Sequence, residues 1–198
     1  CLFYINQTKL DIYKNYPLKK KFFFKKKFII LHLDEKWYTQ FYYNDFTNIN
    51  PDATQIDFFI KKILEMSKNN FDIVITTGSR KLEKLNHFIS DFKKQNDNVF
   101  TKSINNNCIT YINKTSFNDL ESLIQDCSFL ICCEGGVSHV SHNLNIDTIA
   151  FFEKNRLQHT EYWTGHMNKL TLYERKKMDD LLNDDNFFNL FKTKIEKI

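Results

Sequence analysis

The sequence predicts an α/β fold, in which helices cover both faces of a mainly parallel β-sheet. Short apolar runs typical of buried strands alternate along the chain with longer stretches whose apolar residues recur at helical spacing. The 198 residues include only 4 Gly and 2 Pro, too few for an all-β sandwich rich in tight turns. With 42% apolar residues and 20 Phe, the chain can bury a substantial core.

The sheet is expected to start where the pattern changes after a lead-in segment. Buried strands are predicted at Phe28–Leu33, Phe71–Thr77, Phe129–Cys133 and Thr148–Phe152. Val99–Phe100 is predicted as a further short strand, and Cys108–Ile112 is a candidate to extend the sheet.

Two helices are predicted in the first half of this pattern. Pro51 and Asp52 open the first one, and a second is expected from about Arg80 to Lys94. The apolar positions of the first fall on one face at Ile56, Phe59, Ile60, Ile63 and Leu64, and those of the second at Leu82, Leu85, Phe88, Ile89 and Phe92.

Two more helices and a helical tail are predicted in the second half. One begins at Ser116, whose side chain is suited to cap the first turn, and the next runs from Val137 to Leu144. The tail is expected to be helical from about Tyr173, with apolar positions at Leu181, Leu182, Phe187, Phe188, Leu190 and Phe191. We therefore expect a lead-in over residues 1–27, a Rossmann-like domain over 28–172 and a C-terminal helical tail over 173–198.

The net charge of +4 is mild, from 28 basic and 24 acidic residues, and gives no reason to expect a nucleic-acid partner. Most of the excess lies in Lys19–Lys21 and Lys25–Lys27, on either side of three phenylalanines. Such runs are usually just solvated. The alternative is peripheral contact with an anionic membrane, which basic and aromatic residues together can supply.

The 5 cysteines are odd in number and irregularly spaced, so no disulfide framework is expected. A reducing, cytoplasmic setting fits this usage, and neither a signal peptide nor an apolar run of the ~20 residues that span a bilayer is visible. The chain begins with Cys1 and not with Met, which leads us to expect that an N-terminal portion precedes it.

In a parallel sheet, ligands bind at the carboxyl ends of the strands, and the loop after Cys133 has the parts of an anion site. Gly135 and Gly136 allow close approach of the backbone. The N–H groups of Val137, Ser138 and His139 would then point outward from a helix start, where the dipole favours phosphate. The simpler alternative is a strand-to-helix turn that needs glycine for packing alone.

The loop after Leu33 offers Lys36 as a flexible cation for the same phosphate, or as an ordinary solvated lysine. Trp37 beside it either stacks on a ligand or anchors the loop.

Further along the chain, Glu83 is a minor candidate to bind a ribose. Trp163 and His166 either close over a base or sugar, or are a buried Trp and a hydrogen-bonded His. His139 and His142 lack a third ligand at a persuasive spacing, so we expect no metal site.

With these loops in place, the chain resembles the C-terminal half of a family 9 glycosyltransferase, the group that includes the ADP-heptose:lipopolysaccharide heptosyltransferases. The resemblance covers roughly Phe28 to His166. Its main element is the family's Asp-Thr-Gly-x-x-His loop, matched by Glu134-Gly135-Gly136-Val137-Ser138-His139. A lysine after the first strand of that domain is matched by Lys36.

The resemblance implies a two-domain GT-B enzyme whose second, Rossmann-like domain binds a nucleotide diphosphate sugar, ADP-heptose or similar. It implies inverting transfer to a glycan or lipid-linked acceptor without a metal or cofactor. Donor-binding residues would be Lys36, Glu134, Gly135, Gly136, Val137, Ser138 and His139. The family's catalytic base lies in the N-terminal, acceptor-binding domain, so none is assigned here.

The chain is expected to depart from the family in two ways, by lacking the N-terminal, acceptor-binding domain and by a change in the motif, and two alternatives stay open. The family's Asp-Thr is Glu-Gly here, so the sugar contacted need not be heptose. One alternative is a related GT-B transferase or epimerase that uses UDP- or GDP-sugars. The other is a non-catalytic, truncated domain that binds a partner or membrane through the basic run and the apolar tail.

Overall fold

The structure is a computed structural model that describes residue 24 and residues 26–38, 49–78 and 83–198. The predictions that fall on Cys1–Phe23, Lys25 and Leu82 lie outside the described residues. Among the described residues, no helix is both long enough and apolar enough to span a bilayer.

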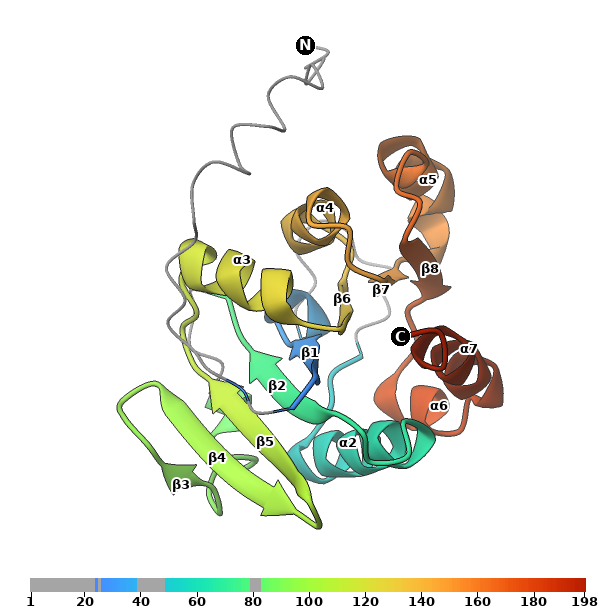
Figure 1. The fold of residues 1–198 in the computed structure, drawn as a ribbon. Helices are drawn as coiled ribbons and strands as arrows, with labels where there is room; N and C mark the ends of the chain where they lie inside the picture. Colours follow the sequence, from blue (N-terminus) through green and yellow to red (C-terminus); the bar gives the residue numbers. More distant parts are fainter. Residues whose placement is uncertain (1–23, 25, 39–48, 79–82) are drawn as a thin grey trace.

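The described residues form an eight-stranded sheet in the order β3-β4-β5-β2-β1-β6-β7-β8 (Figure 1). The six strands from β5 to β8 are parallel, while β4 runs antiparallel to β5 and β3 antiparallel to β4. The strands are β1 (Phe28–His32), β2 (Asp72–Thr76), β3 (Lys93–Lys94), β4 (Val99–Ile104), β5 (Asn107–Ile112), β6 (Phe129–Cys133), β7 (Thr148–Phe152) and β8 (Leu170–Glu174). The predicted fold class is confirmed.

The strand order reverses direction between β1 and β6. From β1 the chain adds β2 and then β5 on one side, and it returns across the sheet to place β6 on the other side of β1. Ile30 lies opposite Leu130 in this central parallel pair. In open α/β sheets the crevice at such a reversal, at the carboxyl ends of the two strands, is the usual ligand site.

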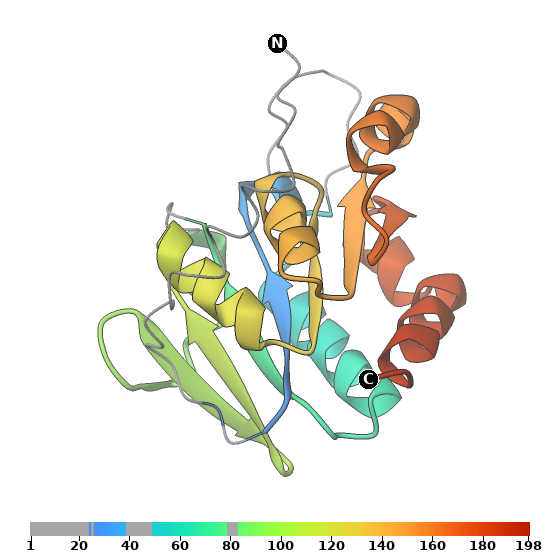
Figure 2. The same ribbon diagram turned by 45° about the horizontal axis from the view of Figure 1, so that its top comes forward.

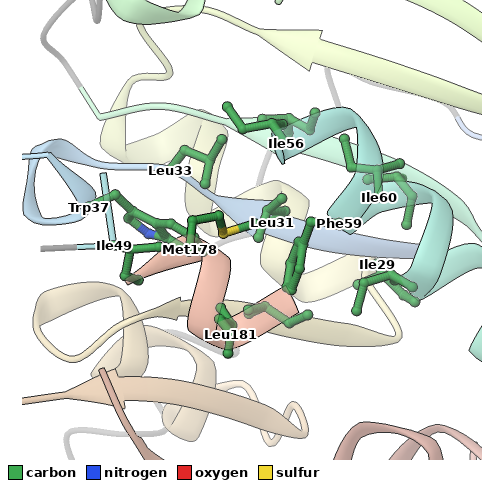
Figure 3. Packing of buried hydrophobic residues seen from close by; sticks show 14 of the residues in the cluster. Ile29, Leu31, Leu33, Trp37, Ile49, Ile56, Phe59, Ile60, Met178 and Leu181 are labelled. Atoms are coloured by element: carbon green, nitrogen blue, oxygen red, sulfur yellow. The ribbon is translucent and has the colours of Figure 1, made fainter. Parts of the chain in front are cut away.

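One face of the sheet is covered by α2 (Ala53–Met66), α6 (Met178–Leu182) and α7 (Asp185–Ile195). Figure 3 shows Ile29 and Leu31 of β1 packed among side chains of α2 and α6. The apolar residues predicted for the first helix, Ile56, Phe59, Ile60, Ile63 and Leu64, are all buried. Asp52 caps this helix in a capping box with Gln55, so the predicted start is confirmed as well.

The opposite face is covered by α3 (Phe117–Asp126) and α4 (Gly136–Asn143). Ser116 caps α3 by accepting the N–H of Asp119, as predicted. Cys132 packs on this face and Cys133 on the other, because neighbouring residues of a strand point to opposite sides.

The helix predicted from about Arg80 to Lys94 is wrong. Its described part holds only a 3-10 turn, η2 (Glu83–Leu85), and further single turns, such as those closed by Ser90 N–H to His87 O and Phe92 N–H to Ile89 O. Leu85, Phe88 and Phe92 are buried, so tertiary packing satisfies the apolar spacing without a helix. Lys93 and Lys94 then pair with β4, which ends any helical path.

The tail is helical later than predicted. Tyr173 belongs to β8, an edge strand that the sequence analysis missed, and helices begin only at Met178 and Asp185. The tail is part of the core, since Leu181, Phe187 and Phe191 are fully buried against the sheet side that α2 also covers. The turn between α6 and α7 is held by Asp184, which accepts hydrogen bonds from the Tyr173 hydroxyl at 2.7 Å and from Lys176 Nζ at 2.5 Å.

Replacement of Phe187 tests whether the tail stabilises the domain. Phe187 is 0% exposed and packs on Phe59 and Phe151, with ring centroids 5.7 and 5.5 Å away. Phe187→Ala should lower the free energy of unfolding by about 3–5 kcal/mol in urea titration, because it leaves a cavity. The control Phe117→Ala removes a ring that is 61% exposed and should change it by less than about 0.5 kcal/mol. Equal effects of the two substitutions would contradict the described packing.

Candidate functional site

The two loops that follow β1 and β6 meet at the reversal of strand order. Lys36 lies in η1 (Glu35–Trp37), directly after β1, and Glu134 follows the last residue of β6. Lys36 Nζ donates a hydrogen bond to the backbone carbonyl of Glu134. The two loops that were predicted to share one phosphate therefore lie in contact, although 98 residues of sequence separate Lys36 from Glu134.

The loop that carries Lys36 is fixed from both ends. The Asp34 side chain caps η1 by accepting the N–H of Lys36 at 3.1 Å. Trp37 is fully buried, with its ring edge-on to Phe151 at a centroid distance of 5.4 Å. Trp37 thus anchors the loop, and the alternative that it stacks on a ligand does not fit its burial.

Gly135 is required by the geometry of the turn. Its φ of 148° and ψ of −157° belong to a region that only glycine adopts readily. A Cβ at this position would also collide with Lys36 Nζ. Gly136 differs, because a Cβ there would have no heavy atom within 4 Å.

The helix start that follows is only partly open to a ligand. The N–H groups of Ser138 and His139 both donate to the carbonyl of Gly135, at 3.1 and 3.4 Å. The Ser138 hydroxyl is buried and donates to the same carbonyl at 2.7 Å. The expectation that these groups point toward a ligand is therefore not met. The N–H groups of Gly136 and Val137 remain, because the first residues of a helix have no intrahelical acceptor.

Three histidines lie close together at α4, namely His139 in its first half, His142 in its last turn and His166 beyond α5. The ring of His166 is 5.1 Å from that of His142 and 6.5 Å from that of His139, centroid to centroid. Burial, followed by the neighbouring His166, lowers the pKa of both His139 and His142. The lowered pKa favours the neutral ring, in which one ring nitrogen of His139 is an N–H donor. Among the described residues, no group of three or more His, Cys, Asp or Glu is arranged to hold a metal ion.

Two titratable groups missed by the sequence analysis, His32 and Asp34, lie near Lys36. His32, at the end of β1, is buried with its Nδ1 2.9 Å from Thr76 Oγ1, and burial, with a smaller effect of Lys36, lowers its pKa to about 4. Burial is also the main reason that the pKa of Asp34 is raised to about 6, against the opposing effect of Lys36. Only their positions near strand ends could have singled them out.

A buried ion pair at the same edge was also missed. Arg175 Nη1 lies 2.8 Å from Glu153 Oε1, and these residues directly follow β8 and β7. The backbone N–H of Arg175 also donates to the backbone carbonyl of Phe152 at 2.7 Å, which extends the pairing of β8 with β7. The sequence did hold a signal for β8, the strand before Arg175, because Leu170 and Leu172 alternate with other residues as is typical of a strand.

The remaining candidates do not join this cluster. Glu83 is an exposed residue at the start of η2. Trp163 lies on α5 (Leu157–Thr164) and is 54% exposed, so the alternative of a buried Trp is wrong. His166 approaches the site only through its contacts with the two histidines of α4.

Comparison with known proteins identifies the family. The sequence model of glycosyltransferase family 9 (heptosyltransferase) matches residues 64–189. The chain belongs to glycosyltransferase family 9. The match includes the loop from Glu134 to His139, but it begins after Lys36. It extends into α7, whereas the resemblance seen in the sequence ended at about His166. No curated protein matches the chain.

Solved structures give weaker similarities. UDP-GlcNAc 2-epimerase of Methanocaldococcus jannaschii is 12% identical with a TM-score of 0.47, over 82% of this chain and 38% of the epimerase chain. ADP-heptose lipopolysaccharide heptosyltransferase II of E. coli is 11% identical with a TM-score of 0.43, over 85% and 48%. The chain thus spans less than half the length of either protein. At these scores the family match remains the basis of the assignment.

A pair of glycine substitutions tests the geometry of the turn. Gly135→Ala should lower the free energy of unfolding by about 1–3 kcal/mol, because alanine is strained at this φ and its Cβ displaces Lys36. Gly136→Ala is the matched control and should be neutral or stabilising by up to about 1 kcal/mol. Thermal and urea unfolding measure both effects, and a harmless Gly135→Ala would contradict the described turn.

Asp34→Asn tests the raised pKa of the Asp34 carboxyl through the pH dependence of the free energy of unfolding. Because the folded-state pKa is raised to about 6, the stability that the protonated form gives is present below the ordinary value of 3.8 and lost as pH rises through 6. The free energy of unfolding, variant minus wild type, should therefore rise by about 2–3 kcal/mol from about pH 4 to pH 7. His32→Gln should shift that difference in the opposite direction, since the lowered pKa of His32 destabilises the fold at low pH. A difference independent of pH in the Asp34 variant would contradict the prediction.

Proposed function

We propose that this chain is the donor-binding half of a glycosyltransferase. In this proposal it binds a nucleotide diphosphate sugar, ADP-heptose in the leading case. The sugar passes to lipopolysaccharide or another cell-surface glycan. Membership of glycosyltransferase family 9 supports the reaction class, and the position of the candidate site at the reversal of strand order supports the ligand class.

The contact of Lys36 with the glycine turn is the observation that carries the proposal. A single ammonium group lies against Gly135, immediately before the positive end of α4. Its present acceptor is a backbone carbonyl, which a diphosphate oxygen can replace as a stronger, charged acceptor. Gly136 is exposed, so its N–H is accessible to the same anion.

These groups would act on the leaving group of the transfer. As the bond from the sugar to the diphosphate breaks, negative charge grows on the phosphate oxygens. Lys36, once its bond to the Glu134 carbonyl is exchanged for one to the diphosphate, would stabilise that charge together with the first N–H groups of α4 and the ring of His139. In the proposed mechanism the acceptor attacks the opposite side of the sugar, which gives inversion. No metal is required, and the base comes from an acceptor-binding domain.

Glu134 is proposed to face the transferred sugar. It is the residue between β6 and the turn, and it is half-buried. The family motif carries Asp-Thr where this chain carries Glu-Gly, so the reach of the carboxylate differs and the alternative sugars of UDP- and GDP-donors stay in the proposal. A titration with ADP-heptose, UDP-glucose and GDP-mannose distinguishes them.

The alternative hypothesis of a non-catalytic docking module relied in part on an apolar tail that would bind a partner. The apolar residues of α6 and α7 are buried in the core and are not available to a partner. Of the basic run, Lys26 and Lys27 donate to the carbonyls of Asn106 and Ile198. Peripheral contact with an anionic membrane on the cytoplasmic side remains part of the proposal through Lys19–Lys21, and flotation with anionic liposomes tests it.

Loss of donor binding on mutation of the cluster is the decisive prediction. Lys36→Ala should raise the Kd for the nucleotide diphosphate sugar about 10- to 100-fold, the value of a charged hydrogen bond, and His139→Ala by up to about tenfold. Lys94→Ala is the control, because this lysine lies on β3 at the far edge of the sheet and pairs with Asp97. Calorimetry measures all three. Undiminished binding in both site variants would overturn the assignment.

A further inference from the structure

Three imidazole rings gather beside the proposed donor site. His139 and His142 lie three residues apart on α4 and so share one face of the helix. α5 lies beyond the carboxyl end of β7, at the edge of the sheet where α4 begins (Figure 2). His166, two residues after α5, has its ring edge-on to that of His142 at 5.1 Å and 6.5 Å from that of His139, centroid to centroid. We call these three residues the histidine cluster.

The histidine cluster is open to a solute. His166 is exposed, and His139 and His142 are half-buried. A neutral imidazole has one N–H donor and one acceptor nitrogen, whereas the protonated ring has two donors and a positive charge. The cluster can therefore change from a polar surface into a cationic one when it takes up a proton.

Mutual repulsion opposes charging of the unliganded cluster. Burial, followed by His166, lowers the pKa of His139, and the same two causes, followed by His139, lower the pKa of His142. Two groups from neighbouring loops also act on the pKa of His139: Glu134, after β6, raises it, and Lys36, in η1, lowers it. Together these lowered pKa values favour the uncharged cluster near neutral pH.

An anion beside His139 would reverse this balance. His139 lies within electrostatic reach of Lys36 and Glu134, whose contact marks the proposed place of the diphosphate. A bound anion favours the protonated form of a neighbouring imidazole, and protonation must then strengthen binding of the anion by the same factor. The diphosphate of a nucleotide sugar is esterified at both ends, so it lacks the second phosphate ionisation near pH ~6 and keeps its charge across the neutral range.

We propose that the histidine cluster couples binding of the donor diphosphate to protonation. Binding draws a proton from solvent onto a ring nitrogen of His139, and the cation so formed donates a hydrogen bond to a diphosphate oxygen. His142 and His166 are positioning residues, which act through His139 by holding the unliganded cluster neutral. The proposal rests on the proposed function for the identity of the ligand, but a divalent oxyanion such as sulfate in the same place would have the same effect on the cluster.

NMR of the histidine rings tests the coupling residue by residue. The isotopically labelled chain is titrated from about pH 5 to about pH 8, alone, with saturating ADP-heptose, UDP-glucose or GDP-mannose, and with sulfate in place of chloride at constant ionic strength. The midpoint of the His139 titration should rise by about one pH unit with a bound nucleotide sugar. A residue-specific signal is needed because Asp34 also titrates near Lys36, with a pKa raised to about 6 chiefly by burial.

The affinity for the nucleotide sugar should follow the same protonation. Its Kd should fall about fivefold from about pH 8 to about pH 6, because the bound form holds the proton more tightly. His166→Asn removes the neighbouring imidazole, so the His139 titration and the pH dependence of the Kd should both move to higher pH. A merely structural role of His166 would instead change the Kd equally at every pH. His159→Asn is the matched control and should change neither, since this exposed histidine contacts Trp163 on α5 and is not part of the cluster.

Failure of this proposal and failure of the proposed function give different results. A nucleotide sugar that binds without moving the His139 titration overturns the coupling and leaves donor binding intact. If no nucleotide sugar binds, the proposed function fails and the sulfate series decides. In that series an upward shift of the His139 midpoint that exceeds the shift of His159 supports the coupling, and equal or absent shifts overturn it. An unchanged His139 titration in His166→Asn overturns it as well.

Discussion

The hydrogen bond from Lys36 to the carbonyl of Glu134 is the contact on which the candidate site depends. It joins the loop after β1 to the loop after β6, the two strands between which the sheet reverses its order. The ammonium group occupies the space that a Cβ of Gly135 would need. Glycine is required at position 135 chiefly by its φ of 148°, and the absence of a Cβ also leaves room for the Lys36 ammonium group.

Packing and hydrogen bonds hold the charged side chains around this contact in place. Trp37 against Phe151 fastens one loop to the core, and Asp34 caps the turn from which Lys36 extends. Arg175 and Glu153 form a second, buried charge pair at the ends of β8 and β7. The charged side chains at this edge are thus held by hydrogen bonds and packing at the ends of β1, β7 and β8.

Aromatic residues are buried in α7 and β7 but exposed in α5. In α7 and β7, phenylalanines such as Phe151 and Phe187 are fully buried and stack on one another, so they stabilise the sheet. In α5 the threonines are buried and the rings of Tyr162 and Trp163 are exposed. The first arrangement follows from the hydrophobic effect, whereas the second leaves two aromatic rings in contact with solvent.

Much of this structure follows from local patterns that the sequence displays. The four central strands, the capped start of α2 at Asp52 and the strand-turn-helix around Gly135 were predictable, because each depends on side-chain periodicity or on one capping residue. The apolar spacing of Leu85, Phe88 and Phe92 gave the wrong element, since burial against the sheet can satisfy it through separate turns.

The sequence by itself determined the fold class and the two loops in which to look for a site. Only the tertiary structure decided that Trp37 is an anchor, that the Ser138 hydroxyl belongs to the turn, and that Arg175 pairs with Glu153. The Ser138 hydrogen bond, although local, depends on the backbone conformation of Gly135, whereas the anchoring of Trp37 on Phe151 and the pairing of Arg175 with Glu153 depend on contacts between segments far apart in the sequence. Such contacts are set by the packing of the whole sheet, and no local pattern records them.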